Sequence, residues 1–319
     1  MDYIIFDLEW NQSIPSKDEE KNKDLPIEIV EIGAVKLNSN REMISEFSEL
    51  IKPQVYHELN SITRRLIHIQ MEELEKGKPF VEVMERFLEW CGDDYIFCTW
   101  GNLDLLELQR NMKYYNMEPL SNGPIRFYDI QKLFSVAYED GKSRRTLEYA
   151  IDMMGVRKDI PFHRAFSDAY YTAQIFDMIE DPDVLELYSY DAYCIPQSKD
   201  EEIYVVFKDY AKQITRGFLT KAELFEDKET TSIYCYHCDR KLRKKIKWFS
   251  LNKKIYHALA KCPKHGYVKS KLRVRKTEDG LFYGVKTDKC VSAEDAALVH
   301  DKLEKFKLAK KEKKMNISI

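Results

Sequence analysis

Apolar and polar residues follow a mixed pattern along the first 180 or so positions. Three apolar runs with the period of a strand come first, at residues 3–8, 29–37 and 44–51. Apolar residues at helical spacing then predict helices at 79–91, 103–115, 129–138, 146–154 and 165–179, with short strands at 95–100 and 126–128. Strands followed by alternating strands and helices indicate an α/β domain with a central mixed sheet flanked by helices.

The pattern changes beyond residue 182, which we take as the end of the first domain. Residues 183–230 are rich in Tyr and Phe with interspersed charges, and we expect a helical connector there. Residues 231–277 carry three strand-like runs, KIKWFSL, KIYHALA and YVKSKLRVRK, and are predicted to form a small domain. Residues 278–319 are a basic C-terminal segment that ends in a helix or a frayed tail.

Composition indicates a packed globular protein, because 44% of the 319 residues are apolar and 13% are aromatic. No apolar run reaches the roughly 18 residues of a transmembrane helix, and no basic region precedes the first strand, so neither a membrane span nor a signal peptide is expected. The chain has seven Cys, an odd number. Together these features favour a reducing, cytoplasmic location, in which clustered Cys bind metal rather than form disulfides.

The formal net charge of −3 conceals an asymmetry between the two ends of the chain. From Glu229 onward there are 24 Lys and Arg against 10 Asp and Glu, whereas the preceding part has 27 against 44. A basic region of this kind suggests a polyanionic partner, although a solvated Lys-rich tail would give the same pattern.

Two carboxylates interrupt the first apolar run, which reads IIFDLEW. Because side chains alternate between the faces of a strand, Asp7 and Glu9 point the same way. Two negative charges beside a buried run are costly unless a positive group lies there. Asp104 begins a later helix, and His163 and Asp168 lie at the entry to the last helix. Taken singly, such an Asp is usually a helix N-cap and such a His is structural.

The order and spacing of these residues resemble those of the DEDDh family of 3′-5′ exonucleases, which have an RNase H-like fold. The similarity extends over residues 2–180 and is closest to the Eri-type, RNase T-like and proofreading branch. It includes three stretches of sequence: IEIVEIGAVKL at 27–37, LEYAIDMMGV at 147–156 and HRAFSDA at 163–169. His163 lies five residues before Asp168, whereas the sister branch has a Tyr four residues before it, where this chain has Arg164.

The resemblance implies that the chain is an enzyme that hydrolyses single-stranded RNA or DNA, short oligonucleotides included, from the 3′ end to 5′-monophosphates. It implies two Mg²⁺ or Mn²⁺ ions, one held by Asp7, Glu9 and Asp168 and the other by Asp7 and Asp104. Oxygen ligands suit these hard cations. His163 would be the general base, for which an unperturbed pKa of about 6.5 is suitable.

Other interpretations of the same residues stay open. One is a non-catalytic nucleic-acid-binding or regulatory protein on an exonuclease fold, and another is a proofreading partner of a polymerase. The chain departs from many family members in having Trp10 directly after Glu9, where a Thr or Ala is common, and we expect Trp10 to contact substrate or to pack. The resemblance also suggests a homodimer.

A second candidate site lies in the C-terminal region, where two pairs of metal-ligating residues occur close together. Cys235 and Cys238 form a Cys-x-x-Cys pair, and Cys262 and His265 form a Cys-x-x-His pair. Four such ligands fit a tetrahedral structural Zn²⁺ ion in a zinc-ribbon-like domain, whose folding would depend on the metal. The alternative is a redox-active or merely packed Cys-x-x-Cys.

Basic and aromatic residues are interleaved around the cysteines, as in proteins that bind single-stranded nucleic acid. Basic residues at alternate positions from Lys269 to Arg275 share one strand face. We expect substrate contacts from four of the basic residues, Arg243, Lys244, Arg273 and Arg275. The aromatic residues Trp248, Phe249, Tyr256 and Tyr267 are either base-stacking platforms or the core of the small domain, and the core interpretation is favoured.

Overall fold

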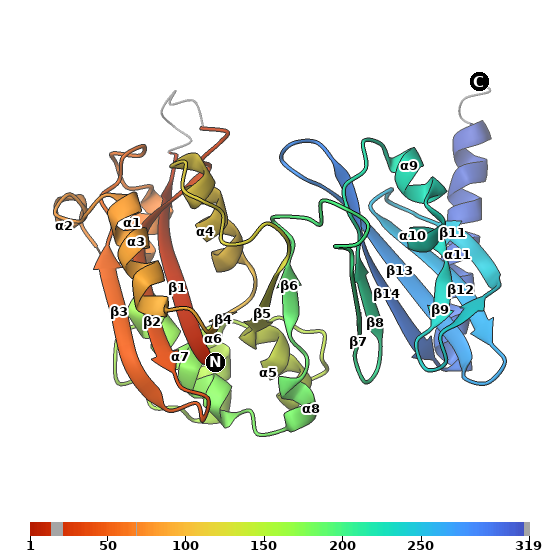
Figure 1. Cartoon of the computed structure of the whole chain (residues 1–319), viewed down its shortest axis with the longest axis horizontal. Helices are drawn as coiled ribbons and strands as arrows, with labels where there is room; N and C mark the ends of the chain where they lie inside the picture. Colours follow the sequence, from red (N-terminus) through yellow and green to blue (C-terminus); the bar gives the residue numbers. More distant parts are fainter. Residues whose placement is uncertain (14–21, 68, 316–319) are drawn as a thin grey trace. The chain divides into compact units, whose positions relative to one another are not determined.

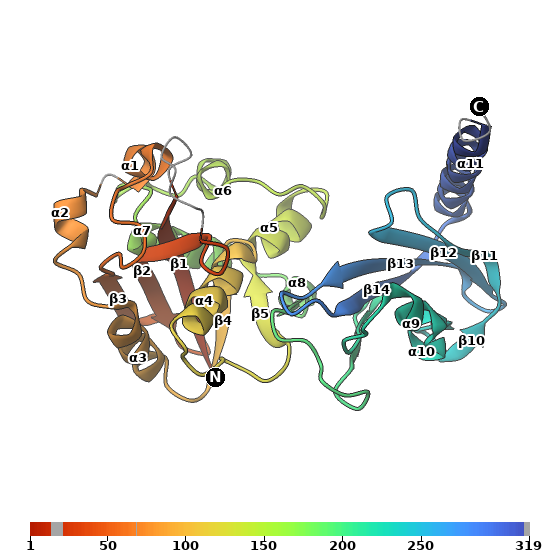
Figure 2. The same cartoon turned by 90° about the horizontal axis from the view of Figure 1, so that it is seen from above.

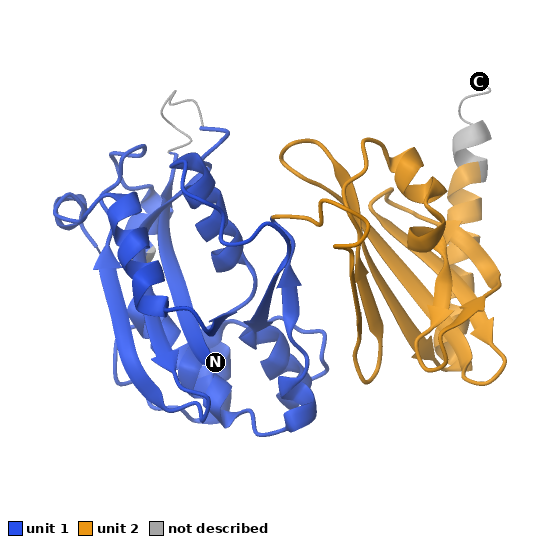
Figure 3. Cartoon of the chain, viewed as in Figure 1, with its two compact units in different colours: residues 1–193 blue, residues 194–319 orange. Residues whose placement is uncertain are grey.

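The computed structural model describes residues 1–13, 22–67 and 69–315, with side chains described to residue 310 apart from that of Leu66. It divides the chain into two compact units, residues 1–193 and residues 194–319 (Figure 3). Within the described residues, no helix combines the length and the apolar content that crossing a membrane requires.

Unit 1 is built on a six-stranded mixed sheet with the strand order β3-β2-β1-β4-β5-β6. Strand β1 pairs antiparallel with β2 and parallel with β4. The expectations for the first three strands and for the two later short strands are confirmed. The strands are β1 Asp2–Gln12, β2 Ile27–Leu37, β3 Met43–Leu50, β4 Tyr95–Thr99, β5 Ile125–Asp129 and β6 Ser189–Asp191.

Helices cover both faces of this sheet (Figures 1 and 2). On β1, Phe6 packs with residues of α3 and α4, whereas its neighbour Ile5 packs with residues of α5, α6 and α7. The five predicted helices are confirmed, and three short helices were not predicted. The helices are α1 Ser61–Ile67, α2 Met71–Leu74, α3 Phe80–Cys91, α4 Leu103–Tyr114, α5 Ile130–Tyr138, α6 Leu147–Met154, α7 Ala165–Met178 and α8 Pro182–Leu185.

Local capping signals fix several helix ends in unit 1. The side chain of Asp129 accepts a hydrogen bond from the backbone N–H of Lys132 at the start of α5. Thr146 does the same for Tyr149 at the start of α6, and Gly155 ends that helix with a φ of 67°. Such caps satisfy backbone groups that have no partner inside the helix, which is why these ends could be read from sequence.

Unit 2 is built on a second, antiparallel six-stranded sheet, with the order β11-β12-β13-β14-β8-β7. Helix α11 packs on one face of the sheet through Ala296 and Val299. A separate hairpin of β9 and β10 packs with β12 and β13 residues through Ile233 and Leu242. The elements are β7 Ile203–Val206, β8 Ala211–Ile214, α9 Lys221–Glu226, α10 Lys228–Thr231, β9 Ile233–Cys235, β10 Arg240–Leu242, β11 Lys244–Phe249, β12 Ile255–Cys262, β13 Gly266–Lys276, β14 Phe282–Val291 and α11 Ala293–Met315.

The organisation expected for the second half of the chain differs from the structure. Residues 183–230 are not a helical connector, because β6, β7 and β8 lie there and the helices α8, α9 and α10 are short. The segment 231–277 is not a domain by itself, since its strands β11, β12 and β13 share a sheet with β7 and β8. The described part of 278–319 supplies β14 and α11 to the same unit, while residues 316–319 lie outside the described part of the chain.

The interleaved aromatic residues of unit 2 belong to its core, as expected. The indole Nε1 of Trp248 donates to the carbonyl oxygen of Thr231 at 2.9 Å, and Phe249 is buried. The ring of Tyr256 lies 4.5 Å from that of Phe225, and Tyr267 packs against the α11 cluster. These rings hold the sheet to its flanking helices.

A glycine on β2 allows α7 to lie unusually close to the unit 1 sheet. A Cβ atom added at Gly33 would lie 1.9 Å from the backbone N of Phe166 and 2.2 Å from the backbone C of Ala165. Both contacts are to main-chain atoms of α7, which cannot rotate away. Gly33 therefore sets the distance between β2 and the first turn of α7.

We predict that Gly33→Ala destabilises unit 1, because the helix backbone must shift to admit the methyl group. Overpacking of this kind typically costs about 1–3 kcal/mol. Urea unfolding would measure the loss. The matched control is Gly123→Ala, where an added Cβ meets no atom within 4 Å. Equal unfolding midpoints for the two variants would contradict this account of the β2–α7 contact.

Candidate active site and cysteine cluster

Strand β1 presents Asp7 and Glu9 on the face of the sheet that α7 covers. The two residues continue the row of Ile5, which packs against that helix layer. Across the antiparallel pair, Asp7 is opposite Gly33 and Glu9 is opposite Glu31. The close approach that Gly33 permits therefore occurs directly beside Asp7.

The first turn of α7 carries Asp168 to these two carboxylates. Ligand oxygens of Asp7, Glu9 and Asp168 all lie within 4.8 Å of one another. Oδ1 of Asp168 is buried and has no hydrogen-bond partner among the described residues. A buried, unpaired carboxylate oxygen that faces two other carboxylates is what a divalent cation site offers before the ion binds.

Asp104 reaches the same place from the other side of β1. It lies on the first turn of α4, the helix that follows β4. Because β4 runs parallel to β1, the carboxyl ends of the two strands lie at the same end of the sheet. The side chain of Asp104 is only 5% exposed, and a hydrogen bond from the backbone of Leu8 reaches its carboxylate. Leu8 lies between Asp7 and Glu9, which places Asp104 next to both.

Burial and mutual repulsion raise the pKa of every one of these carboxyls. The pKa of Asp7 is raised well above its usual value by burial and then by the charges of Asp104, Asp168 and Glu9. Burial and the charge of Asp168 raise the pKa of Glu9 to about 8. Burial raises the pKa of Asp168 to about 6, although His163 opposes this rise. Positive charge is therefore needed to keep all of them ionised at neutral pH.

His163 lies in the loop that enters α7 and is exposed. Its backbone is left-handed, with a φ of 63°, which is uncommon for a residue other than glycine. Both its ring charge and its backbone lower the pKa of Asp168, so the imidazole lies beside the cluster. The structure thus gathers all five residues predicted for the active site at one end of the sheet.

Glu31 and Arg164 form an ion pair at this site that the sequence did not predict. Glu31 is only 1% exposed, and Arg164 binds its carboxylate through Nε at 3.1 Å and through Nη2 at 2.8 Å. The carboxylate also accepts a hydrogen bond from the backbone N–H of Ala165. Because Arg164 and Ala165 directly follow His163, the pair fixes the turn that presents the imidazole. A charged residue in the apolar run of β2 was the available signal.

Trp10 is half-buried and packs against the cluster of apolar residues between the sheet and α3. A register shift between Glu9 and Trp10 marks an irregularity in the β1–β2 pair. The next residue, Asn11, donates to the carbonyl oxygens of Tyr56 and Glu58, which ties the end of β1 to the loop before α1. The structure therefore gives Trp10 a packing role, and a contact with substrate stays a prediction.

The four predicted zinc ligands come together in unit 2 at two hairpin turns. Their ligand atoms lie within 4.8 Å of one another. The sulfur atoms of Cys238 and Cys262 are 3.8 Å apart, and Nδ1 of His265 lies 3.2 Å from the sulfur of Cys235. A tetrahedron with Zn–S bonds of about 2.3 Å has sulfur atoms about 3.8 Å apart, so the donor set fits this ion.

The two turns that carry these ligands have the same local form. The residue after the second ligand of each pair has a positive φ, 52° at Asp239 and 80° at Gly266. Burial alone would raise the pKa of the Cys262 thiol, but hydrogen bonds from the backbone of His265 and Lys264 outweigh it and lower that pKa to about 6. A thiol that ionises readily is a better metal ligand.

The basic residues predicted to contact substrate divide into two groups. Arg273 and Arg275 lie on β13 and are exposed. Lys244 is the first residue of β11, and Arg243 lies between β10 and β11. Burial and the charges of Lys241 and Lys247 lower the pKa of Lys244. These are therefore distinct cationic groups of unit 2.

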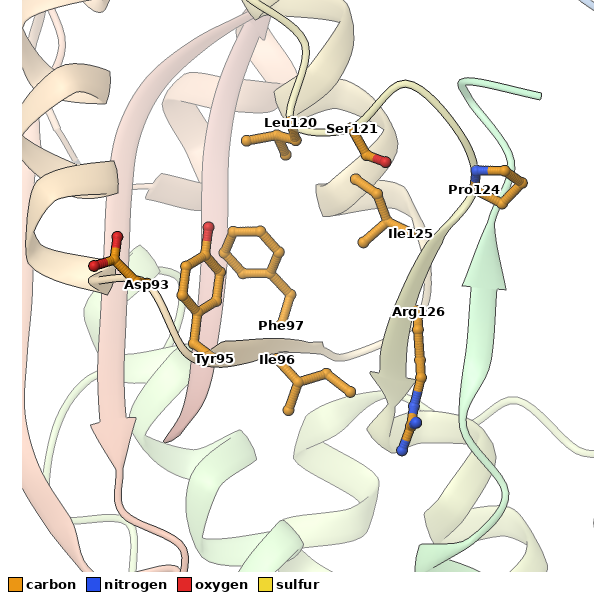
Figure 4. Close-up of a pocket in the computed structure, with 9 residues that line it drawn as sticks. All are labelled: Asp93, Tyr95, Ile96, Phe97, Leu120, Ser121, Pro124, Ile125 and Arg126. Carbon is orange, nitrogen blue, oxygen red and sulfur yellow. The ribbon is translucent and has the colours of Figure 1, made fainter. Parts of the chain in front are cut away.

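A pocket of about 350 Å³ lies at the other end of the unit 1 sheet from the carboxylates (Figure 4). Its lining residues come from the start of β4, such as Tyr95, from the segment before β5, such as Ser121, and from β5 itself, such as Arg126. The carboxylates lie at the other end of these strands: Asp7 and Glu9 are in the second half of β1, and Asp104 comes after the last residue of β4. The pocket is therefore separate from the carboxylate cluster.

Comparison with known proteins places the carboxylate-bearing unit in a family. A sequence model of the family described as Exonuclease, RNase_T, matches residues 4–176. The probable 3′-5′ exonuclease KapD of Bacillus subtilis is 24% identical over 157 residues, which cover 48% of this chain and 73% of KapD. The PolC-type DNA polymerase III of Thermotoga maritima is 28% identical over 178 residues, which cover 54% of this chain but only 11% of the polymerase.

Solved structures of nucleases are similar to this chain as well. The nuclease domain of 3′hExo, a DEDDh family member bound to rAMP, is 19% identical with a TM-score of 0.47, over 55% of this chain and 90% of that domain. Cell-death related nuclease 4 is 17% identical with a TM-score of 0.47, over 60% of this chain and 66% of that protein. Since the family model spans more than half of the residues, this chain belongs to the exonuclease family, and it is a nuclease.

Proposed function

We propose that this exonuclease removes nucleotides from the 3′ end of single-stranded RNA or DNA and releases 5′-monophosphates. The convergence of oxygen atoms from Asp7, Glu9 and Asp168 within 4.8 Å, with Asp104 beside them, carries the proposal. Apolar strands support these carboxylates, which is the arrangement expected of a site that holds cations against a scissile phosphate.

The carboxylates would hold two divalent cations, Mg²⁺ or Mn²⁺. Asp7, Glu9 and Asp168 would ligate one ion, and Asp7 and Asp104 the other. Bound cations of this kind supply Lewis-acid stabilisation of the charge that develops around a phosphate during in-line displacement. The unpaired Oδ1 of Asp168 and the raised pKa values of Asp7 and Glu9 support this ligand set.

His163 would accept a proton from the attacking water. Its imidazole is exposed and therefore accessible to water and substrate, and the neighbouring Asp168 would stabilise the imidazolium that forms. Arg164 and Glu31 act through the backbone, since their ion pair fixes the turn on which His163 lies. They are positioning residues in this proposal.

Two other interpretations have weaker support. A non-catalytic nucleic-acid-binding protein would not need all five residues brought to one place. A proofreading role beside a polymerase has support from the PolC-type relatives, but the match covers about a tenth of such a polymerase. A homodimer, suggested by resemblance alone, stays a prediction.

We predict that the wild-type chain, supplied with Mg²⁺ or Mn²⁺, shortens a 5′-labelled oligonucleotide one nucleotide at a time. His163→Ala should lower the rate by about 10²–10⁴-fold, the usual contribution of a general base. Asp7→Asn should reduce activity below detection while the fold is kept. A time course on matched RNA and DNA oligomers of increasing length would measure both effects and the sugar preference.

The matched control for Asp7→Asn is Asp2→Asn, which removes the same charge from the start of the same strand. It should cleave at the wild-type rate. If Asp7→Asn cleaved as fast as Asp2→Asn, the assignment of the active site would be wrong.

We also propose that Cys235, Cys238, Cys262 and His265 hold a structural Zn²⁺ ion. All seven cysteines of the chain are free, and the four ligand atoms already have tetrahedral spacing. The ion would join the β9–β10 hairpin to the turn between β12 and β13. Reduced thiols are also consistent with the cytoplasmic location that we propose.

Elemental analysis of the purified chain should give about one zinc per chain. Cys235→Ser should lose the metal and lower the melting temperature, because the ion links two hairpins. Cys290→Ser is the control: this cysteine packs beside the same cluster but is not one of the four ligands, so zinc should be retained. Well under one zinc per wild-type chain would refute the site.

A further inference from the structure

A row of cations runs along β13 on the face of the unit 2 sheet that α11 partly covers. Lys269, Lys271 and Arg273 occupy alternate positions of the strand, so they share this face with Tyr267, which packs against α11. Alternate side chains on a strand are about 7 Å apart. The row is thus a regular line of positive charge on a rigid element.

Neighbouring strands and the helix widen this row. In the strand register, His257 of β12 is opposite Lys271 of β13, and Lys289 of β14 is opposite Lys269 of β13. Lys302 of α11 is close enough to lower the pKa of both His257 and Lys271. We refer to these residues together as the β13 patch: His257, Lys269, Lys271, Arg273, Lys289 and Lys302.

Like charges crowd one another in the β13 patch. Burial, then Arg273, Lys269 and Lys302, lower the pKa of Lys271. Burial followed by Lys302, Lys269 and Lys271 lowers the pKa of His257 to about 4, so its ring is neutral at physiological pH. Nδ1 of His257 is buried and has no hydrogen-bond partner among the described residues.

No carboxylate offsets the central cations of the patch. Lys271, Arg273 and Lys302 form no ion pair within the described part of the chain. The opposite face of the sheet is different: the buried Lys286 donates to the carbonyl oxygen of Ser232 at 2.9 Å and lies 3.9 Å from a carboxylate oxygen of Asp288. The fold pairs the lysine that it buries, whereas Lys271, Arg273 and Lys302 are in no ion pair within the described residues.

The neighbouring aromatic rings do not offer a stacking surface for bases. Trp248, Phe249 and Tyr256 are held in the core of unit 2, and Tyr267 packs against α11. A surface with several cations and no free ring binds backbone phosphates and carries no sequence information.

We propose that the β13 patch binds the phosphodiester backbone of single-stranded nucleic acid and retains substrates longer than a few nucleotides on the enzyme, whatever their sequence. The choice of occupant rests on the proposed function, because a nuclease is offered a polyanionic strand as its substrate. Charge complementarity supports it: the part of the chain from Glu229 onward has 24 basic against 10 acidic residues.

Binding of a labelled 20-nucleotide oligomer to the full chain tests this proposal. Asp7→Asn serves as the background, so that the oligomer stays intact, and the salt concentration is varied. Lys271→Gln with Arg273→Gln should weaken binding at least tenfold at low salt. The slope of log affinity against log salt should become shallower by about 1.4, because each phosphate contact on a single strand contributes about 0.7.

The control is Lys305→Gln with Lys310→Gln, which removes the same charge from exposed positions of α11 outside the patch. It should bind nearly as the Asp7→Asn background does. Arg273→Gln alone should give about half the change in the salt slope. Because Arg273 is exposed, this single variant should fold normally, so it controls for a folding defect in the double variant. Unchanged binding by the patch variants, or weaker binding with an unchanged slope, would overturn the proposal.

Two further measurements separate this proposal from other occupants and from failure of the proposed function. With Asp7 restored, the patch variants should raise the KM for the 20-mer more than the KM for a dinucleotide. An equal rise in KM for the two substrates would overturn the retention role. Binding to phosphatidylserine vesicles without binding to the oligomer would show that the patch is a membrane contact. Absence of hydrolysis in the wild type would count against the nuclease proposal, while the binding measurement would still decide the patch.

Discussion

The repulsion among the carboxylates gathered at one end of β1 is the constraint on which unit 1 depends. Oxygen atoms of the half-buried Asp7, Glu9 and Asp168 lie within 4.8 Å of one another, and Asp104 adds a buried carboxylate. Two charges at 4 Å repel by roughly 4 kcal/mol at an effective dielectric of about 20, so the chain must hold this arrangement against a substantial force. Apolar packing on both faces of β1 and the close approach of α7 at Gly33 supply that hold.

The same constraint explains the ion pair behind the cluster. Glu31 adds one more carboxylate opposite Glu9, and its charge contributes to the raised pKa of both Asp7 and Glu9. Arg164 pairs with it at 2.8 Å, so this charge is neutralised by the protein itself, whereas in our proposal cations offset those of the cluster. On that proposal, one charged group has a structural role and its neighbours a chemical one.

Much of unit 1 could be predicted from sequence because its signals are local. Strand alternation places Asp7 and Glu9 on one face, and caps such as Thr146 and Gly155 mark helix ends. Gly33 and Glu31 were missed, since their roles depend on α7, which is more than 130 residues away in the chain. The need for a glycine at position 33 follows from the contact between β2 and α7, which the local sequence around Gly33 does not indicate.

Unit 2 shows the same division between local and long-range information. The two pairs of candidate zinc ligands could be predicted because each pair lies within four residues, and the structure brings the pairs together. The sequence predicts a helical connector at 183–230, where the structure has β7 and β8. Strand β8 pairs with β14, some 70 residues further along, and β7 is added to the sheet through β8. A run as short as Ala211–Ile214 has no period that favours a strand over a helix without that partner.

The most direct test of the carboxylate account is the melting temperature of the chain against pH, with and without Mg²⁺. The carboxyl pKa values are raised in the folded state, to about 8 at Glu9, so the folded chain binds more protons than the unfolded chain. Stability without added cation should therefore fall as pH rises from about 4, the unfolded value, towards 8. Mg²⁺ should restore it at pH 8 and have little effect at pH 5, and Asp7→Asn should flatten both responses. Stability without cation that rises over this range, or a Mg²⁺ effect that is equal at both pH values, would contradict the account.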